Sequence, residues 1–296
     1  MNILTFGQQY HKPIVLALGF FDCVHVGHQK LIQSAMRMAN ASQAETAVFT
    51  FENNPSSFFT PSKLLYTFSE RVEILEEFGV DTVLKAVFDR EFMNLPAERF
   101  LAMLTDYNLK GLVCGFDYTF GAGAEGNASV LERFASERNV PFHREGEVLF
   151  DGKKAGSSLV KTYLTEGKLA EANACLNRSF SVEGIVTEGY RVGRSIGFPT
   201  ANLKICEQKL YPKEGVYAGR VLWNGKLFTA IVNVGSRPTF ADAEKKVEVH
   251  LLHFNGNLYG QNIRVYFDRF LRDVRSFGSA EELKQQLQKD KEAAEA

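Results

Sequence analysis

Apolar positions in the first half of the chain alternate between short continuous runs and sets at helical spacing. The run at 14–18 is typical of a strand buried in a parallel sheet, and the apolar positions from 29 to 40 follow at helical spacing. The alternation continues with expected strands at 46–51, 82–87 and 111–115 and expected helices at 69–78, 96–105 and 127–138, with Ser69 as an N-cap. This pattern predicts an α/β domain with a doubly wound parallel sheet and helices on both faces.

The pattern changes near residue 180. Strand-like segments follow without a helical set between them, at 180–187, 216–223, 227–234, 247–254 and 263–270. The pair Asn224-Gly225 is a strong hairpin signal. We therefore expect an antiparallel sheet or a small antiparallel β-barrel, followed by a terminal helix at about 279–291. The predicted domains are 1–178 and 179–296, divided after the helical segment 158–176.

Composition narrows the class of protein. Hydrophobic residues make up 45% of the chain, which excludes a disordered protein, and the net charge of −1 argues against a nucleic-acid or membrane-surface partner. No apolar run has the length of a membrane span. The four cysteines are scattered without a CxxC pair, so we expect reduced thiols and a cytoplasmic location. The pattern does not indicate an oligomeric state.

Two histidines stand where the first buried strand gives way to a helix. Residues 19–28 read Gly-Phe-Phe-Asp-Cys-Val-His-Val-Gly-His. A strand-to-helix junction offers free backbone N–H groups and the positive end of a helix dipole, and imidazoles can donate to phosphate oxygens. A single histidine there would be a cap or a surface residue. The pair His25 and His28, separated by Gly27, indicates nucleotide chemistry.

The segment 25–28 resembles the HxGH signature of the nucleotidylyltransferase superfamily. The wider run resembles the N-terminal module of the bacterial bifunctional riboflavin kinase/FAD synthetase family, with Cys23 where that family usually has glycine. The resemblance implies that a phosphate oxygen of FMN attacks the α-phosphorus of ATP and that pyrophosphate leaves. His25 and His28 would stabilise the transition state.

Three more segments resemble motifs of the same module. Residues 50–55 resemble its Thr-Phe-x-x-His-Pro run with Asn54 in place of histidine, and 115–121 resemble its Gly-x-Asp/Asn-Phe-x-Phe-Gly motif. Residues 156–161 resemble its Ser-Ser-Thr-x-x-Arg triphosphate motif, with Lys161 in place of arginine. Lysine lacks the bidentate grip of arginine, so weaker triphosphate binding is expected. The resemblance implies ATP or flavin contacts from Gly19, Phe20, Asp22, Asn53, Asp117, Ser157, Ser158 and Lys161.

A glycine-rich segment at 189–203 ends in Thr200 and Asn202. Their side chains offer hard oxygen ligands suited to Mg²⁺, although composition alone favours an ordinary surface loop. The segment resembles the riboflavin kinase signature, and the match continues at 211–218, 233–240 and 247–252. The resemblance implies that Glu248 is the general base and that Thr200 and Asn202 bind Mg²⁺-nucleotide. It also implies ATP or flavin contacts from Gly193, Arg194, Gly197, Phe198, Pro199, Thr200, Asn202 and Arg272.

The resemblance thus predicts an enzyme that phosphorylates riboflavin to FMN and adenylylates FMN to FAD. Riboflavin, FMN and ATP would be its small-molecule partners, with Mg²⁺ as cofactor. Two alternatives stay open. Cys23, Asn54 and Lys161 favour a monofunctional riboflavin kinase with a drifted N-terminal module, and a non-catalytic flavin carrier is the other. His253, where the family usually has Asp, disturbs an unidentified loop contact in either case.

Overall fold

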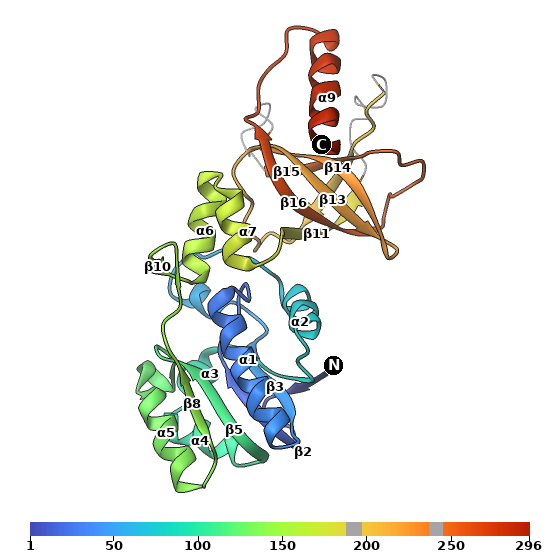
Figure 1. Cartoon of the computed structure of the whole chain (residues 1–296). Helices are drawn as coiled ribbons and strands as arrows, with labels where there is room; N and C mark the ends of the chain where they lie inside the picture. Colours follow the sequence, from blue (N-terminus) through green and yellow to red (C-terminus); the bar gives the residue numbers. More distant parts are fainter. Residues whose placement is uncertain (188–196, 237–244) are drawn as a thin grey trace. The chain divides into compact units, whose positions relative to one another are not determined.

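The computed structural model describes residues 1–187, 197–236 and 245–296. Its contacts divide the chain into two compact units, 1–157 and 158–296 (Figure 1). The segments Gly193–Arg194 and 237–240, which belong to the motifs noted in the sequence, lie outside the described residues. The second unit begins with two consecutive helices, α6 (Ser157–Glu166) and α7 (Leu169–Leu176).

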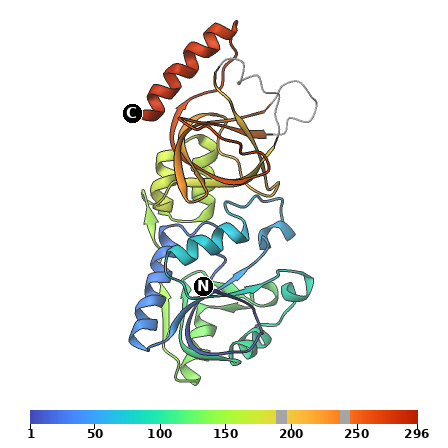
Figure 2. The same ribbon diagram turned by 90° about the vertical axis from the view of Figure 1, so that its right-hand side faces the viewer.

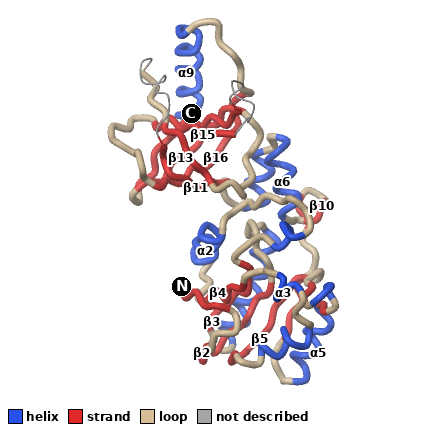
Figure 3. The backbone as a smooth tube through the Cα atoms, turned by 180° about the vertical axis from the view of Figure 1, so that it is seen from behind, coloured by secondary structure: helices blue, strands red, loops and turns tan. Residues whose placement is uncertain are grey.

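A six-stranded parallel sheet forms the core of the N-terminal unit (Figure 3). Its strands run in the order β1-β4-β3-β2-β5-β8. Their bounds are β1 (Asn2–Thr5), β4 (Thr82–Ala86), β3 (Glu45–Phe51), β2 (Tyr10–Leu18), β5 (Tyr107–Gly115) and β8 (Phe142–Glu145). The strand order reverses at β2, which pairs with β3 on one side and β5 on the other. Ligands of open parallel sheets bind beyond the carboxyl ends of the strands at such a point.

Helices cover both faces of this sheet, as expected for a doubly wound fold. On one face, side chains of α4 (Ala97–Leu104) and α5 (Ala128–Glu137) join the core with Ile14, Leu16 and Leu18 of β2. On the other, α1 (Val26–Ala41) crosses β2 and β5, and its Met38 side chain lies directly over Gly111. The remaining helices of the unit are α2 (Phe68–Glu77) and the short α3 (Arg90–Met93).

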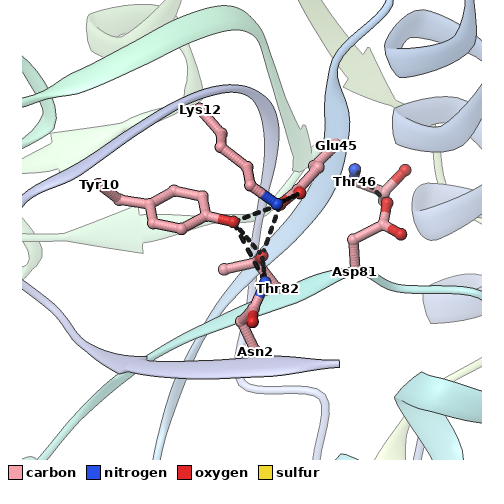
Figure 4. A network of polar contacts seen from close by, with 7 residues as sticks. All are labelled: Asn2, Tyr10, Lys12, Glu45, Thr46, Asp81 and Thr82. Atoms are coloured by element: carbon pink, nitrogen blue, oxygen red, sulfur yellow. Dashed lines mark hydrogen bonds and ion pairs between the residues drawn. The ribbon is translucent and has the colours of Figure 1, made fainter.

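A polar network joins the first residues of four strands at the amino edge of the sheet (Figure 4). The carboxylate of Glu45 on β3 accepts hydrogen bonds from Tyr10, Lys12 and Thr82. Burial opposes ionisation of Glu45, but these hydrogen bonds outweigh it and lower the pKa of the carboxyl group. The network holds the starts of these strands together at the amino edge of the sheet. Ligands are expected at the opposite edge, where the strands end.

Six antiparallel strands of the C-terminal unit close into a barrel, in the order β11-β12-β15-β14-β13-β16 (Figure 2). Their bounds are β11 (Phe180–Thr187), β12 (Ala201–Ile205), β15 (Lys245–Leu251), β14 (Lys226–Ser236), β13 (Gly215–Trp223) and β16 (Asn262–Arg272). Asn224 and Gly225 form the β13–β14 turn with φ values of 48° and 72°, so the hairpin prediction is confirmed. The terminal helix α9 (Ala280–Glu295) contacts β13 and β14.

Helix α7 packs on the barrel. The Asn173 amide donates to the carbonyl of Phe267 at 2.9 Å and accepts the N–H of Phe180 at 2.7 Å. These contacts place α7 in the same compact unit as the barrel. We keep the limits 1–178 and 179–296 as a proposal for the two functional domains.

Some elements differ from the sequence-based expectations. Thr67, not Ser69, caps α2, because a capping box pairs Thr67 with Glu70. Strand β12 runs through residues expected to form a loop, and the short edge strands β1 and β8 were not predicted. Among the described residues no helix is long and apolar enough to cross a membrane.

Candidate active sites

His25 is the N-cap of helix α1. Its Nδ1 atom accepts the backbone N–H groups of Gly27 at 3.1 Å and His28 at 3.4 Å. Since Nδ1 is an acceptor, the ring proton of the neutral imidazole lies on Nε2. A Cβ on Gly27 would lie only 3.0 Å from the His25 ring, so glycine permits this close approach.

The rings of His25 and His28 stack, with centroids 3.8 Å apart. Phe21 contacts the His28 ring from another side, at 4.9 Å between centroids. Both imidazoles are therefore held against α1 at its N-terminus, the end of a helix that favours anions.

A cavity of about 810 Å³ opens beside His28 at the carboxyl ends of β2, β3 and β5, and His25 is not among its described lining residues. Of the predicted contacts, Gly19, Phe20, His28 and Asp117 line it. Much of the remaining wall is aromatic, formed by Phe49, Phe51, Phe59, Phe88, Phe92, Phe100, Tyr118 and Phe120. A flat apolar ring and a phosphate could both be accommodated here, the ring among the aromatic side chains and the phosphate beside His28.

Two predicted contacts have their polar groups occupied by the protein. The Asn53 amide exchanges two hydrogen bonds of 2.7 Å with the backbone of Phe88. Asp22 is buried and accepts the N–H of Leu65 at 3.2 Å. Asn54, at the usual histidine position, caps a short 3-10 helix and donates to Ser62. In this structure these residues shape the loops around the cavity and do not line it.

Asp117 lines the cavity but is paired. Lys154 contacts its carboxylate and lies 4.7 Å from the ring centre of Phe116. A free carboxylate would repel polyphosphates, and the ammonium group reduces that repulsion.

The triphosphate motif begins at the limit between the two compact units. Ser157 belongs to the N-terminal unit, where its hydroxyl lies 3.5 Å from the Cys23 thiol. Ser158 and Lys161 continue on α6 in the second unit. Cys23 lies outside the left-handed φ region, so this loop does not require glycine there.

In the barrel, three polar residues of the kinase motifs form a row across neighbouring strands. Glu248 on β15 pairs in register with Asn202 on β12 and with Asn233 on β14. Directly paired residues share one face of a sheet with Cβ atoms about 5 Å apart. Val247 and Val249 fill the opposite face and are fully buried. Asn233 was not among the predicted site residues, although its motif was noted.

A second cavity of about 540 Å³ lies at one end of the barrel. Pro199 and Thr200 line it together with residues 254–259 of the β15–β16 loop. Glu248 and Asn202 are not among its described lining residues. Gly197 and Phe198 precede it in the chain, and Phe198 packs on the ring of His250.

His250 fixes the chain at this cavity. Its Nδ1 donates to the carbonyl of Pro199 at 2.7 Å, and burial lowers the pKa of its imidazole, while the Pro199 contact opposes the shift. Sequence reasoning missed this residue. The sequence could have pointed to His250 only by its position, because it lies two residues beyond Glu248 and therefore on the same face of the strand.

Arg272 is engaged away from both cavities. Its guanidinium pairs with the buried carboxylate of Asp290 on α9, at distances down to 2.7 Å. His253 contacts Glu295 at 2.7 Å, also on α9. The structure therefore gives both residues a part in attaching the terminal helix.

Known proteins match both halves of the chain. A family model described as FAD synthetase matches residues 7–159, and one described as riboflavin kinase matches 176–296. The bifunctional riboflavin kinase/FMN adenylyltransferase of Escherichia coli K12 is 35% identical, covering 98% of this chain and 94% of the relative. The enzyme of that name from Listeria monocytogenes is 34% identical, covering 95% of this chain and 91% of the relative.

A crystal structure supports the same architecture. A Streptococcus pneumoniae protein titled a macrolide-efflux protein is similar with a TM-score of 0.89 and 28% identity. The match covers 99% of this chain and 98% of that one. The two family matches and the curated relatives show that this chain belongs to the bifunctional riboflavin kinase/FMN adenylyltransferase family, enzymes that use ATP to make FMN from riboflavin and FAD from FMN.

Proposed function

We propose that adenylyl transfer takes place at the carboxyl edge of the parallel sheet, with His25 and His28 as catalytic residues. The observation that carries this proposal is the stacked histidine pair beside the 810 Å³ cavity at the switch point of the sheet. A phosphate oxygen of FMN forms the new bond to the α-phosphorus of ATP as the bond to the β-phosphate oxygen breaks. The Nε2–H of His25 and the ring of His28 stabilise the charge that develops on the phosphates.

The reaction needs no covalent intermediate on the protein. The nearby thiols of Cys23 and Cys114 are buried, and burial raises the pKa of Cys114 to about 12. A neutral buried thiol is a poor nucleophile. Direct attack by FMN is therefore the simpler route.

Riboflavin phosphorylation is proposed at the barrel, with Glu248 as general base. Glu248 takes the proton of the riboflavin 5′-hydroxyl as that oxygen attacks the γ-phosphorus and ADP leaves. Asn202 and Asn233 flank Glu248 on the adjacent strands, so their amides are placed to orient the hydroxyl or the phosphate. Thr200, at the barrel cavity, lies two residues before Asn202.

Magnesium is proposed to arrive with the nucleotide. The described residues include no group of three or more His, Cys, Asp or Glu side chains that could hold a metal ion. Thr200 and Asn202 offer one hydroxyl and one amide oxygen, which suits Mg²⁺ that keeps phosphate and water ligands. When bound, Mg²⁺ neutralises polyphosphate charge. With ATP as substrate and four cysteines that form no disulfide, we propose a cytoplasmic location.

Reciprocal variants test the residue roles. Glu248→Gln should abolish FMN formation from riboflavin and leave FAD formation from supplied FMN unchanged. His28→Ala should lower FAD formation by about 10²-fold or more and leave FMN formation unchanged. Loss of both activities in either folded variant would refute the assignment of separate sites.

A further inference from the structure

The loop between β2 and α1 holds two residues in unfavourable backbone conformations. Phe21 has a φ of 53° and Val24 a φ of 47°, in the left-handed region that non-glycine residues rarely adopt. A β-branched residue such as Val24 is especially disfavoured there. Such a loop keeps its shape only when its surroundings hold it.

Arg71 of helix α2 is one group that holds the loop. Its side chain is fully buried, and its Nη1 atom donates to the carbonyl of Phe20 and the hydroxyl of Thr50, both at 2.9 Å. The Thr50 hydroxyl itself donates to the same Phe20 carbonyl at 2.6 Å. The start of the histidine loop is thus fixed by two donors.

The same guanidinium reaches the neighbouring strand end. Its Nη2 atom donates to the carbonyl of Phe51 at 2.7 Å, and its Cζ atom lies 4.8 Å from the ring centre of Phe20. Phe20 and Phe51 both line the 810 Å³ cavity. One side chain therefore sets the spacing between two walls of the adenylyltransferase cavity.

Burying a guanidinium group costs free energy unless its N–H groups are hydrogen-bonded. Burial lowers the pKa of Arg71 to about 10, with Asp22 opposing the shift, so the side chain stays charged at neutral pH. Its hydrogen-bond acceptors are backbone carbonyls and a hydroxyl on separate chain segments. The planar fork of arginine can hold several such acceptors at fixed angles, which lysine cannot do.

Gln29 holds the other end of the loop. Its buried side-chain amide donates to the carbonyl of Val24 at 2.9 Å. The strained segment from Phe21 to Val24 is therefore held at Phe20 by Arg71 and at Val24 by Gln29. His25 follows immediately and caps α1.

We propose that Arg71 is a positioning residue for adenylyl transfer, which acts by holding the Phe20 carbonyl so that His28, with His25 stacked on it, faces the cavity at a fixed distance from the end of β3. The proposal rests on the roles assigned to the two histidines. Arg71 lies in the N-terminal unit and the barrel in the other unit, so riboflavin phosphorylation by the same molecule reports on protein concentration, and thermal denaturation reports on folding of the N-terminal unit.

The test compares Arg71→Met, Arg71→Lys and the control Glu77→Gln, an exposed change at the end of the same helix. We expect Arg71→Met to lower kcat for FMN adenylylation by about 10²-fold, as displaced catalytic groups do, with KM for ATP changed less than about threefold. The kcat of Arg71→Lys should lie between those of wild type and Arg71→Met, and Glu77→Gln should keep the wild-type kcat. Riboflavin phosphorylation should keep its wild-type rate in all three variants.

Chemical rescue separates positioning from a general loss of folding. In Arg71→Ala, millimolar guanidinium should restore part of kcat in a saturable way, while ammonium should not. Wild-type kcat in Arg71→Met or Arg71→Lys would overturn the proposal. A loss of kcat in proportion to the unfolded fraction, measured by thermal denaturation, with no rescue by guanidinium would also overturn the proposal. His28→Ala tests the histidine roles separately, because guanidinium cannot rescue that variant.

Discussion

The imidazoles of His25 and His28 stack with centroids 3.8 Å apart and planes 25° from parallel. The contact arises because His25 caps the helix on which His28 lies, with its Nδ1 atom turned to the helix N–H groups. His25 thus combines a structural bond at Nδ1 with a proposed catalytic donor at Nε2. The two roles can be separated by substitution.

Replacing His25 with asparagine should keep the cap and remove the catalytic donor. Asparagine is among the best N-cap residues, whereas alanine cannot accept the N–H groups. We expect both variants to lower FAD formation by about 10²-fold. Only His25→Ala should also lose stability, by about 1 kcal/mol, measured by urea denaturation. Full activity in His25→Asn would show that capping is the sole role of this residue.

Replacements of His250 should show which ring nitrogen matters. The amide nitrogen of asparagine can take the place of Nδ1, which donates to Pro199, whereas that of glutamine corresponds to Nε2. His250→Asn should keep kcat for riboflavin phosphorylation within about twofold, and His250→Gln should lower it by about fivefold, since losing one hydrogen bond is worth about 1 kcal/mol. Steady-state kinetics with riboflavin and ATP measures both. Equal rates in the two variants would contradict the positioning of Pro199 by this bond.

Acid should destabilise the N-terminal unit through Glu145. Burial opposes its ionisation, but Ser34, Lys30 and His143 contact the carboxylate and lower its pKa to about 2. Because the folded-state pKa lies below the ordinary value, the contribution is complete above about pH 5 and is lost as the pH falls towards 2. The shift corresponds to about 3 kcal/mol at most.

The comparison of Glu145→Gln with wild type by urea denaturation at pH 7 and pH 3 measures this contribution. We expect a large difference in unfolding free energy at pH 7 that shrinks at pH 3. Glu147→Gln, an exposed change two residues away, is the matched control and should show no such difference. A difference independent of pH would exclude the ionised carboxylate as the source.

Lys161→Arg should improve the adenylyltransferase. Arginine restores the bidentate grip on phosphate that the family motif provides, so KM for ATP in FAD formation should fall several-fold. The control Lys168→Arg, on an exposed side chain of the same unit, should change nothing. An unchanged KM in Lys161→Arg would show that this position does not hold the triphosphate.

Apolar patterning predicted the parallel sheet of the first half, and for the second half an antiparallel sheet or small barrel. Parallel strands buried on both faces give continuous apolar runs, as at β2 and β3, and the β13–β14 hairpin is encoded by two residues that accept positive φ. Strand β12 was missed because its residues Ala201–Ile205 lie within a motif interpreted as a loop. Edge strands β1 and β8 are short, so they leave little periodicity to detect.

The site was predictable only in part, because a motif gives residue types without their partners. Asn53 was expected to contact ligand, but its amide is used by the backbone of Phe88, which is 35 residues away in the chain. Arg71 gave no signal, since an arginine at an apolar helix face is indistinguishable from a surface residue until its burial is known. Arg272 pairs with Asp290 in this structure, and its contact with the flavin or nucleotide stays a prediction.

The central claim is that one chain runs two reactions at two separate sites. The most direct test mixes Glu248→Gln and His28→Ala in equal amounts with riboflavin, ATP and Mg²⁺ and separates the flavins by chromatography. We predict unchanged riboflavin from the first variant alone, FMN with almost no FAD from the second alone, and abundant FAD from the mixture. A mixture that forms no more FAD than His28→Ala alone would contradict the two-site account.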